Sequence, residues 1–187
     1  MAFQFKIQLK NIKKPPVWRQ IIIPENFTFE QFHMVIQQSF GWKIYHLYQF
    51  SPSGYGSSPV ITKPSEDKWE KPGINASITK LASVFNTEGQ KYTYIYDFGD
   101  DWIHSIKLEK ILPGKALKAL CSAGKGACPP EDCGGTLGYE QLKEILKDPA
   151  HKEYNSMIEW MGMENRKDNF DPDKFYLKDV NNSLLEI

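Results

Sequence analysis

The sequence predicts an α+β protein with one mixed β-sheet: a strand–strand–helix–strand start, then a long β-hairpin, then C-terminal helices. Three patterns support this. Apolar residues alternate over 3–9, a capped amphipathic segment covers 29–40, and a second alternating stretch covers 91–110. Alternation with period two is typical of a strand with one buried face, whereas spacings of three and four residues are typical of a helix.

The first fifty residues are β-grasp-like in the order of their elements. After the strand at 3–9, a run rich in β-branched residues over 17–23 ends at Pro24, and residues 46–50 form a third predicted strand. The order strand, strand, helix, strand, with the helix soon after a proline-ended strand, resembles the first part of ubiquitin-like domains.

The helix over 29–40 has the clearest sequence signals in the chain. Thr28 stands at the N-cap position and Gln31 three residues later, as a capping box requires. Gly41 follows at the position where a left-handed residue commonly ends a helix.

The rest of the chain alternates between loops and short elements. Ser51–Asn75 is rich in Ser, Pro and Gly, with Trp69 as its large ring and a short strand near Tyr55–Ile61. Ser77 is placed to cap a short helix. Lys91–Lys110 predicts a hairpin whose tip is at 98–100, and residues 112–138 form a glycine- and proline-rich loop. Helices are expected at about 139–147, from Pro149 to about 161, and after Asp171-Pro172.

Length and composition indicate one ordinary globular domain. The 187 residues form a single α+β domain in this interpretation, with a β-grasp-like half over 1–50 and the hairpin, cysteine loop and C-terminal helices over 76–187. The formal net charge is zero, from 23 basic and 23 acidic residues, which argues against a chain built mainly to coat nucleic acid, although a local basic patch is compatible with it. No stretch has the length of a membrane span or the pattern of a signal peptide, and we expect a cytoplasmic protein with reduced cysteines and no membrane partner.

Several short strings together resemble a known family. They are Pro16-Val17-Trp18-Arg19, Gly41-Trp42, His46-Leu47, the stretch Tyr96–Trp102 with His104, and Pro129–Asp132 with Gly134-Gly135 and Gly138-Tyr139. In this order they resemble the plasmid pRiA-ORF-like family, which is named after an open reading frame of a root-inducing plasmid. The resemblance implies an α+β fold and a link to mobile elements, without a defined activity. The family pattern has a second histidine two residues after His46, where this chain has Tyr48.

The strongest candidate site is the acidic hairpin tip. Three carboxylates lie within five residues, and a histidine follows on the next strand, so the group could hold a divalent cation or act in acid–base catalysis. The alternative is structural: aspartates commonly cap tight turns, and the histidine would then be a partly buried core residue. The tip residues are Asp97, Asp100, Asp101, Trp102 and His104.

The loop after the hairpin gives a second candidate. Glu131 and Asp132 stand between prolines and glycines, and such a loop could present both carboxylates to the hairpin tip. Its alternative role is a stiff turn. The cysteines could bind zinc with His104 or His151 as fourth ligand, but their spacing lacks the usual close pair and favours buried thiols. They are Cys121, Cys128 and Cys133.

These observations leave two functional hypotheses. The first is a non-catalytic interaction module that binds a protein or nucleic-acid partner through the loop-rich face, with no cofactor; the neutral charge does not favour nucleic acid. The second is a metal-dependent hydrolase or nuclease. Its candidate catalytic residues are Asp97, Asp101, His104 and Glu131. The candidate binding residues are Asp97, Asp100, Asp101, Trp102, His104, Glu131 and Asp132; all of these except Trp102 form the acidic site of the hydrolase hypothesis.

Overall fold

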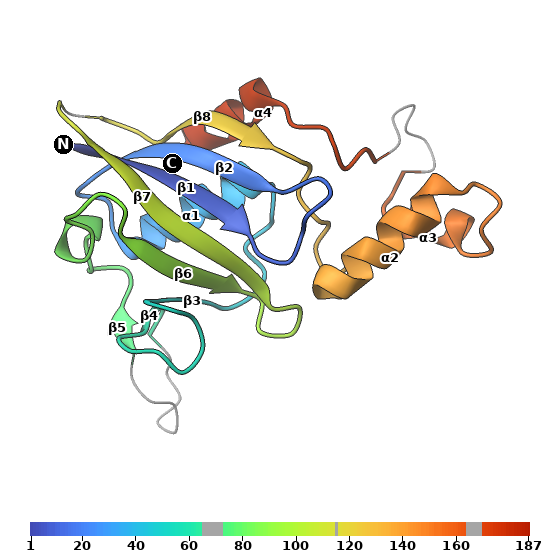
Figure 1. The fold of residues 1–187 in the computed structure, drawn as a ribbon, viewed down its shortest axis with the longest axis horizontal. Coiled ribbons are helices and arrows are strands. Elements are labelled where there is room, and N and C mark those ends of the chain that lie inside the picture. Colours follow the sequence, from blue (N-terminus) through green and yellow to red (C-terminus); the bar gives the residue numbers. More distant parts are fainter. Residues whose placement is uncertain (65–72, 115, 164–169) are drawn as a thin grey trace.

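The computed structural model describes residues 1–64, 73–114, 116–163 and 170–187. Within these ranges the chain forms one eight-stranded sheet and four α-helices, which confirms the α+β class (Figure 1). The strands are β1 (Ala2–Leu9), β2 (Trp18–Pro24), β3 (Tyr48–Ser51), β4 (Ile61–Thr62), β5 (Ile74–Asn75), β6 (Lys91–Tyr96), β7 (Trp102–Leu112) and β8 (Leu120–Lys125). The helices are α1 (Phe29–Phe40), α2 (Gly135–Lys147), α3 (Tyr154–Trp160) and α4 (Leu177–Ser183).

The sheet has the strand order β5-β4-β3-β6-β7-β1-β2-β8. It is mixed, because β4 and β5 pair in parallel and the other neighbours pair antiparallel. The observed order β1, β2, α1, β3 agrees with the expected start, whereas the narrower likeness to a β-grasp domain stays a prediction, because β6 and β7 lie between β3 and β1.

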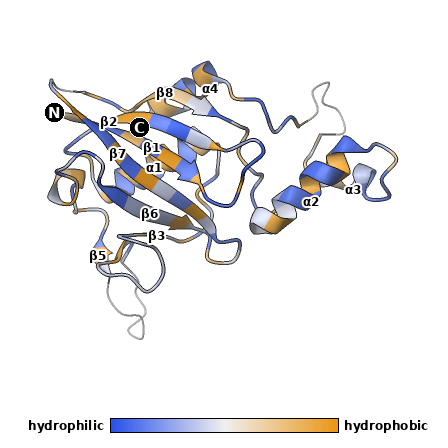
Figure 2. Ribbon diagram, viewed as in Figure 1, coloured by the Kyte–Doolittle hydropathy of each residue, from blue (hydrophilic) through white to orange (hydrophobic). Residues whose placement is uncertain are grey.

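Helix α1 lies behind the sheet in Figure 1, and the opposite face of the central strands is not covered by a labelled helix. The strands are accordingly two-sided: Phe5 is fully buried beside Phe32 of α1, with ring centroids 4.9 Å apart, whereas Lys6 points to the other face. Figure 2 shows the same alternation of hydrophobic and hydrophilic residues along β7. Burying one such phenylalanine contributes roughly 1.5–3 kcal/mol to folding.

The predicted boundaries of α1 are confirmed. Thr28 Oγ1 accepts a hydrogen bond from Gln31 N at 3.2 Å, and Gln31 Oε1 accepts one from Thr28 N at 2.9 Å. Gly41 has φ 93°, in the left-handed region that glycine adopts without strain. The chain turns directly from this helix end into the loop that carries His46.

Two expected elements before the hairpin differ in the structure. Only Ile61–Thr62 is a strand in the stretch where a strand near 55–61 was expected, since Ser51 and Gly54 form a local turn through the Ser51 hydroxyl. Ser77 caps no α-helix: its amide donates to Asn75 Oδ1 at 2.9 Å, and a short 3₁₀ helix follows at Leu81–Ser83. Trp69 lies outside the described residues.

The C-terminal elements also differ from expectation at their starts. The predicted loop over 112–138 contains the edge strand β8, and α2 begins at Gly135 rather than near 139. Pro149 does not open a helix, because Asp148 Oδ1 accepts a hydrogen bond from Ala150 N at 2.9 Å and makes a turn first. Asp171 makes the same kind of turn with Asp173. Figure 1 shows α2 and α3 projecting beyond one end of the sheet, and none of the described helices has the length and hydropathy of a membrane span.

Candidate functional site: a histidine among three carboxylates

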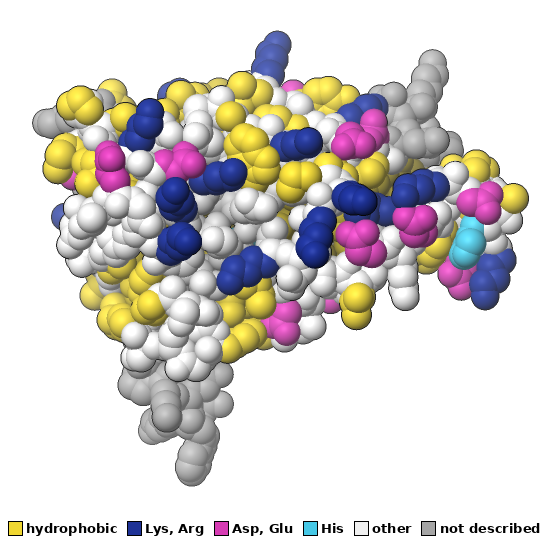
Figure 3. Space-filling model, viewed as in Figure 1, with side chains coloured by type: hydrophobic (Ala, Val, Ile, Leu, Met, Phe, Trp, Pro, Cys, Tyr) yellow, Lys and Arg dark blue, Asp and Glu magenta, His cyan; other side chains and the backbone are white. Residues whose placement is uncertain are grey.

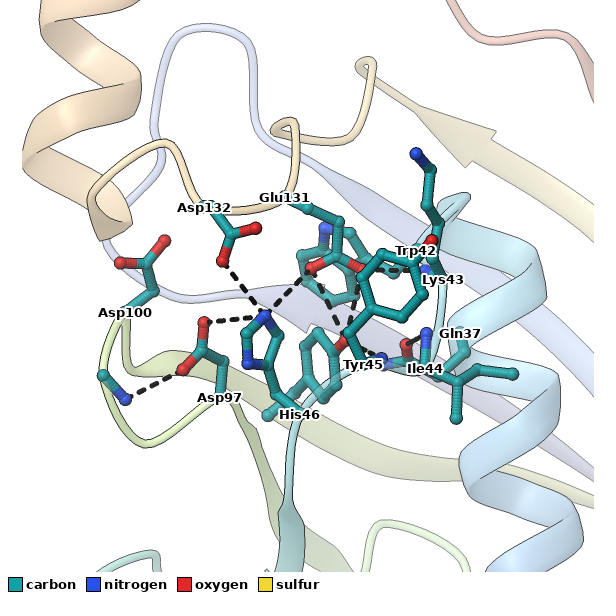
Figure 4. A network of polar contacts seen from close by, with 12 residues as sticks. Gln37, Trp42, Lys43, Ile44, Tyr45, His46, Asp97, Asp100, Glu131 and Asp132 are labelled. Carbon is teal, nitrogen blue, oxygen red and sulfur yellow. Dashed lines mark hydrogen bonds and ion pairs between the residues drawn. The ribbon is translucent and has the colours of Figure 1, made fainter.

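His46 lies at the centre of a group of carboxylates from two distant parts of the chain (Figure 4). Its Nε2 atom is 3.1 Å from Asp132 Oδ1, 3.6 Å from Asp97 Oδ2 and 3.9 Å from Glu131 Oε2. The hairpin tip and the loop over 129–135, called the proline–glycine loop below, therefore do bring carboxylates together, as the sequence suggested they could. The imidazole beside them is that of His46.

The turn after β6 fixes the position of Asp97. Its amide donates to Leu47 O at 3.0 Å, which ties the hairpin tip to the loop that carries His46. Its Oδ1 accepts a hydrogen bond from Gly99 N at 2.9 Å, so Oδ2 is the oxygen that faces His46. The residue has φ 56°, an uncommon conformation for a residue with a side chain, and one that aspartate tolerates better than most.

Glu131 is held from the opposite side. Its Oε1 accepts hydrogen bonds from Lys43 N at 2.7 Å and from the Tyr96 hydroxyl at 3.1 Å, which leaves Oε2 as the atom nearest to His46. The Tyr96 hydroxyl in turn accepts a hydrogen bond from Tyr45 N at 3.1 Å. Burial, with the negative charge of Glu131 as a further cause, raises the pKa of Tyr96 above its usual value, so this hydroxyl stays a donor at neutral pH.

The proline–glycine loop is anchored to the end of α1. Pro129 O accepts a hydrogen bond from Trp42 Nε1 at 3.0 Å. Asp132 has φ 56°, like Asp97, and 63% of its side chain is exposed. The cluster is thus closed at its base by Trp42 and Tyr96 and open to solvent at Asp132.

The cluster gathers groups that could hold a metal ion. Ligand atoms bound to one transition-metal ion lie about 3.0–3.5 Å apart, because each metal–ligand bond is about 2.1 Å long. The ligand atoms of His46, Asp97 and Asp132 all lie within 4.8 Å of one another, so they would have to move closer together to bind one ion. Among the described residues, no lysine or arginine forms an ion pair with Asp97, Glu131 or Asp132.

The position of the His46 imidazole also suits a shared ligand. The ring is 30% exposed, its Nε2 atom is buried, and the polar groups that face this atom are the carboxylate oxygens of Asp132, Asp97 and Glu131, at 3.1–3.9 Å. A bound cation would offset the mutual repulsion of these carboxylates.

Two predicted aspartates lie beside the cluster and bind other groups. Asp100 Oδ2 accepts a hydrogen bond from Gly134 N at 3.1 Å, which connects the hairpin tip to the start of α2. Asp101 accepts a hydrogen bond from the Tyr55 hydroxyl. Both aspartates thus bind groups from other segments rather than cap the hairpin turn, whereas Asp97 both caps the turn and faces His46.

The structure places His104 and Trp102 in the core, away from the carboxylates. Both are fully buried, and the His104 ring lies edge-on to Phe40 and Trp42 at 5.0 and 5.2 Å. Burial lowers the pKa of His104 to about 3, so the ring is neutral at pH 7. The structure thus gives His104 the packing role that the sequence offered as the alternative.

The three cysteines are free thiols, and none belongs to the metal-type cluster found among the described residues. Cys121 is buried on β8. Burial, assisted by the nearby Asp100, raises the pKa of Cys133 to about 12, and burial also raises that of Cys128. Cys128 and Cys133 also pack against the hydrophobic core, so the contacts favour the packing role.

Sequence reasoning missed His46 as a site residue. It precedes β3 and was interpreted as the first residue of a strand, although it belongs to one of the strings that carry the family resemblance. That string was the available signal for His46.

Comparisons with known proteins identify the family of this chain. The family model "Plasmid pRiA4b ORF-3-like protein" matches residues 1–179. The uncharacterised protein y4hQ of Sinorhizobium fredii is 34% identical over 160 residues, which are 85% of this chain and 80% of that protein. A crystal structure of MM3350 from Methanosarcina mazei Go1, a protein of unknown function, is 37% identical with a TM-score of 0.81 over 96% of this chain and 97% of that one. The chain belongs to the plasmid pRiA4b ORF-3-like family.

Proposed function

We propose that this protein binds a divalent transition-metal ion through His46, Asp97 and Asp132 and uses it for metal-assisted hydrolysis. The observation that carries the proposal is the convergence of one nitrogen and two carboxylate oxygens from three separate segments. A mixed nitrogen and oxygen set suits Mn²⁺, Fe²⁺, Co²⁺ or Zn²⁺ better than Ca²⁺, which prefers oxygen alone.

The arrangement has the parts that such chemistry needs. Three protein ligands leave coordination positions for water and substrate, and a bound metal lowers the pKa of that water toward neutrality. Glu131 Oε2, 3.9 Å from His46 Nε2, is the general base in this proposal, since Lys43 N binds Oε1 and the Tyr96 hydroxyl lies closer to Oε1, at 3.1 Å, than to Oε2, at 3.4 Å. Exposure of Asp132 gives a substrate access to the metal.

Metal binding is the first test. Calorimetric titration of the metal-free protein with Mn²⁺ or Zn²⁺ should give one site per chain, and Asp132→Asn or His46→Ala should weaken it by about tenfold or more through loss of a ligand. Asp100→Asn is the matched control, because it removes a neighbouring carboxylate outside the cluster, and it should change the affinity by less than about twofold. Equal binding by all four proteins, or none by the parent, contradicts the proposal.

Hydrolysis is the second test, with a panel of chromogenic phosphodiesters and esters at saturating metal. Glu131→Gln should retain the metal and lose about 10²-fold or more in kcat, the usual contribution of a general base. If the protein binds the metal but shows no metal-dependent turnover, the proposed metal site stands and the proposed hydrolase activity is rejected.

The interaction module remains a second candidate because of the apolar side chains beside the cluster. Tyr45, Leu47 and Phe98 are 67%, 62% and 44% exposed. In this proposal they contact a protein partner, in the cytoplasm and in the context of mobile elements. A partner recovered from the native host by affinity capture should be lost on Leu47→Asp and kept on Leu117→Asp, which changes a leucine that is also exposed. If both variants still capture the partner, this surface is not the binding site.

A further inference from the structure

Three lysines stand side by side across the uncovered face of the sheet. In the strand register, Lys6 of β1 is opposite Lys107 of β7, and Lys107 is opposite Lys91 of β6. Lys91 and Lys107 are exposed and Lys6 is half-buried. Figure 3 shows lysine and arginine side chains spread over this face, which is the one turned to the viewer in Figure 1.

This register carries an electrostatic cost. Like charges directly opposite one another on neighbouring strands destabilise a sheet, and opposite charges are the favourable choice. None of the three lysines forms an ion pair with a carboxylate of the described residues. The acid nearby on β7, Glu109, instead accepts hydrogen bonds from Gln4 and Gln20, at 3.1 and 2.7 Å.

An aromatic ring lies next to the row. The ammonium group of Lys6 is 4.8 Å from the ring centre of Trp18 on β2, and Lys125 of β8 is opposite Trp18 in the register. The face therefore combines positive charge with a half-buried indole. The neutral net charge of the chain conceals this segregation, because several of its acids gather around His46 at the end of the hairpin.

We propose that this open sheet face, defined by Lys6, Lys91, Lys107 and Trp18, binds the phosphate backbone of a single-stranded nucleic acid. The lysine row spans about 10 Å, two strand spacings of about 4.8 Å, and offers a linear series of cations to a polyanion. An adjacent indole can stack on a base, the combination by which sheet surfaces hold single strands. No labelled helix covers or projects from this face to enter a duplex groove. The inference is independent of the metal site.

The test is fluorescence anisotropy with a labelled single-stranded oligonucleotide of about 15 nucleotides, in EDTA and at low salt. The triple variant Lys6→Gln, Lys91→Gln, Lys107→Gln should bind at least about tenfold more weakly than the parent. The control triple Lys80→Gln, Lys152→Gln, Lys178→Gln removes the same charge from exposed lysines of other elements and should bind within about twofold of the parent. The parent's log–log salt slope should be about −2 or steeper, the value for three phosphates neutralised on a single strand.

The named outcomes separate this proposal from the others. An equal loss of oligonucleotide affinity in both triple variants would show a nonspecific effect of net charge and would overturn the proposal. Tighter binding of anionic vesicles or duplex DNA than of the single strand would also overturn it. Because the change removes like-charge repulsion, the first triple should be at least as stable to urea as the parent, which excludes misfolding as the cause of lost binding. Asp132→Asn should bind the oligonucleotide like the parent, so failure of the metal site leaves this result unchanged.

Discussion

The Tyr96 hydroxyl lies 3.1 Å from Glu131 Oε1 and joins the end of β6 to the loop that precedes α2. The same hydroxyl accepts a hydrogen bond from Tyr45 N. One phenol thus connects three segments: the hairpin, the proline–glycine loop and the loop that carries His46. Its ring is fully buried and the Glu131 side chain is 11% exposed, so the connection is partly shielded from water.

We predict that Tyr96→Phe weakens metal binding by a few-fold and destabilises the protein by about 1–2 kcal/mol. The change keeps the ring and removes only the hydroxyl, which leaves Tyr45 N without its partner and frees Glu131 to move. Metal affinity measured by calorimetry and urea unfolding measured by fluorescence check both parts.

Tyr92→Phe is the control for this substitution. Tyr92 lies on the same strand and is also buried, but its hydroxyl has no hydrogen-bond partner among the described residues. Removing that hydroxyl should leave both the affinity and the stability nearly unchanged. If Tyr96→Phe behaves like Tyr92→Phe, Tyr96 is a packing residue and does not position Glu131.

A second prediction concerns Gly138, in the first turns of α2. A Cβ atom there would lie 1.8 Å from the carbonyl oxygen of Cys133, so the helix would have to move away from the loop that carries Asp132. We expect Gly138→Ala to destabilise the protein by about 2 kcal/mol or more and to weaken metal binding as well. Thermal unfolding and metal titration provide the measurements.

Gly89→Ala separates this clash from the general effect of replacing a glycine, because Gly89 precedes β6, at the opposite end of that strand from Asp97. Gly89 has φ 86° and no atom within 4 Å of an added Cβ, so its replacement should cost only the strain of the left-handed backbone, about 1 kcal/mol. Comparable losses of metal affinity in both variants would show that the position of α2 does not control the cluster.

The sequence predicted the elements whose signals are local. The capping box of Thr28 and Gln31 specifies the start of α1, and the alternation over 91–110 specifies the hairpin, because each depends on residues close in the chain. β8 was missed for the opposite reason. Its sequence, Leu-Cys-Ser-Ala-Gly-Lys, alternates weakly, and it becomes a strand through pairing with β2, far away in the chain.

The candidate site shows the same difference between local and long-range signals. Asp97, Glu131 and Asp132 could be nominated from two acidic loops, but their meeting point could not, since it depends on how the end of α1 aims the next loop. That loop supplies His46. His104 was favoured by its closeness to the hairpin tip in sequence, yet alternation along β7 directs its side chain to the α1 side of the sheet, where it is buried.

The last prediction concerns stability at low pH, because two neutral histidines are buried in the core. Burial lowers the pKa of both His33 and His104 to about 3. The Nδ1 atom of His104 lies 2.9 Å from the Trp102 carbonyl, which can only accept, so Nδ1 carries the hydrogen and Nε2 is the atom that would be protonated. Nε2 is buried with no partner among the described groups, which is why the charged form is disfavoured.

The sign of the effect follows from proton binding. In the unfolded chain these histidines take up protons below about pH 6.5, whereas in the folded protein they do so only near pH 3. Between these limits the unfolded state binds more protons, so the free energy of unfolding falls as the pH falls, by up to about 1.4 kcal/mol per pH unit for each histidine. Above about pH 6.5 both states are neutral at these positions and the effect is absent.

His104→Phe tests this account, because it keeps a ring of similar shape among Phe40, Trp42 and Tyr94 and removes one titrating group. Urea unfolding is followed from pH 7 to pH 4. The unfolding free energy should fall less steeply with pH in the variant than in the parent, by up to about 1.4 kcal/mol per pH unit. In the parent, NMR signals of the His33 and His104 rings should not shift with pH while the protein is folded above pH 5. A parent and a variant with the same slope, or a His104 signal that titrates near pH 6.5, would contradict the assignment of His104 as a neutral core residue.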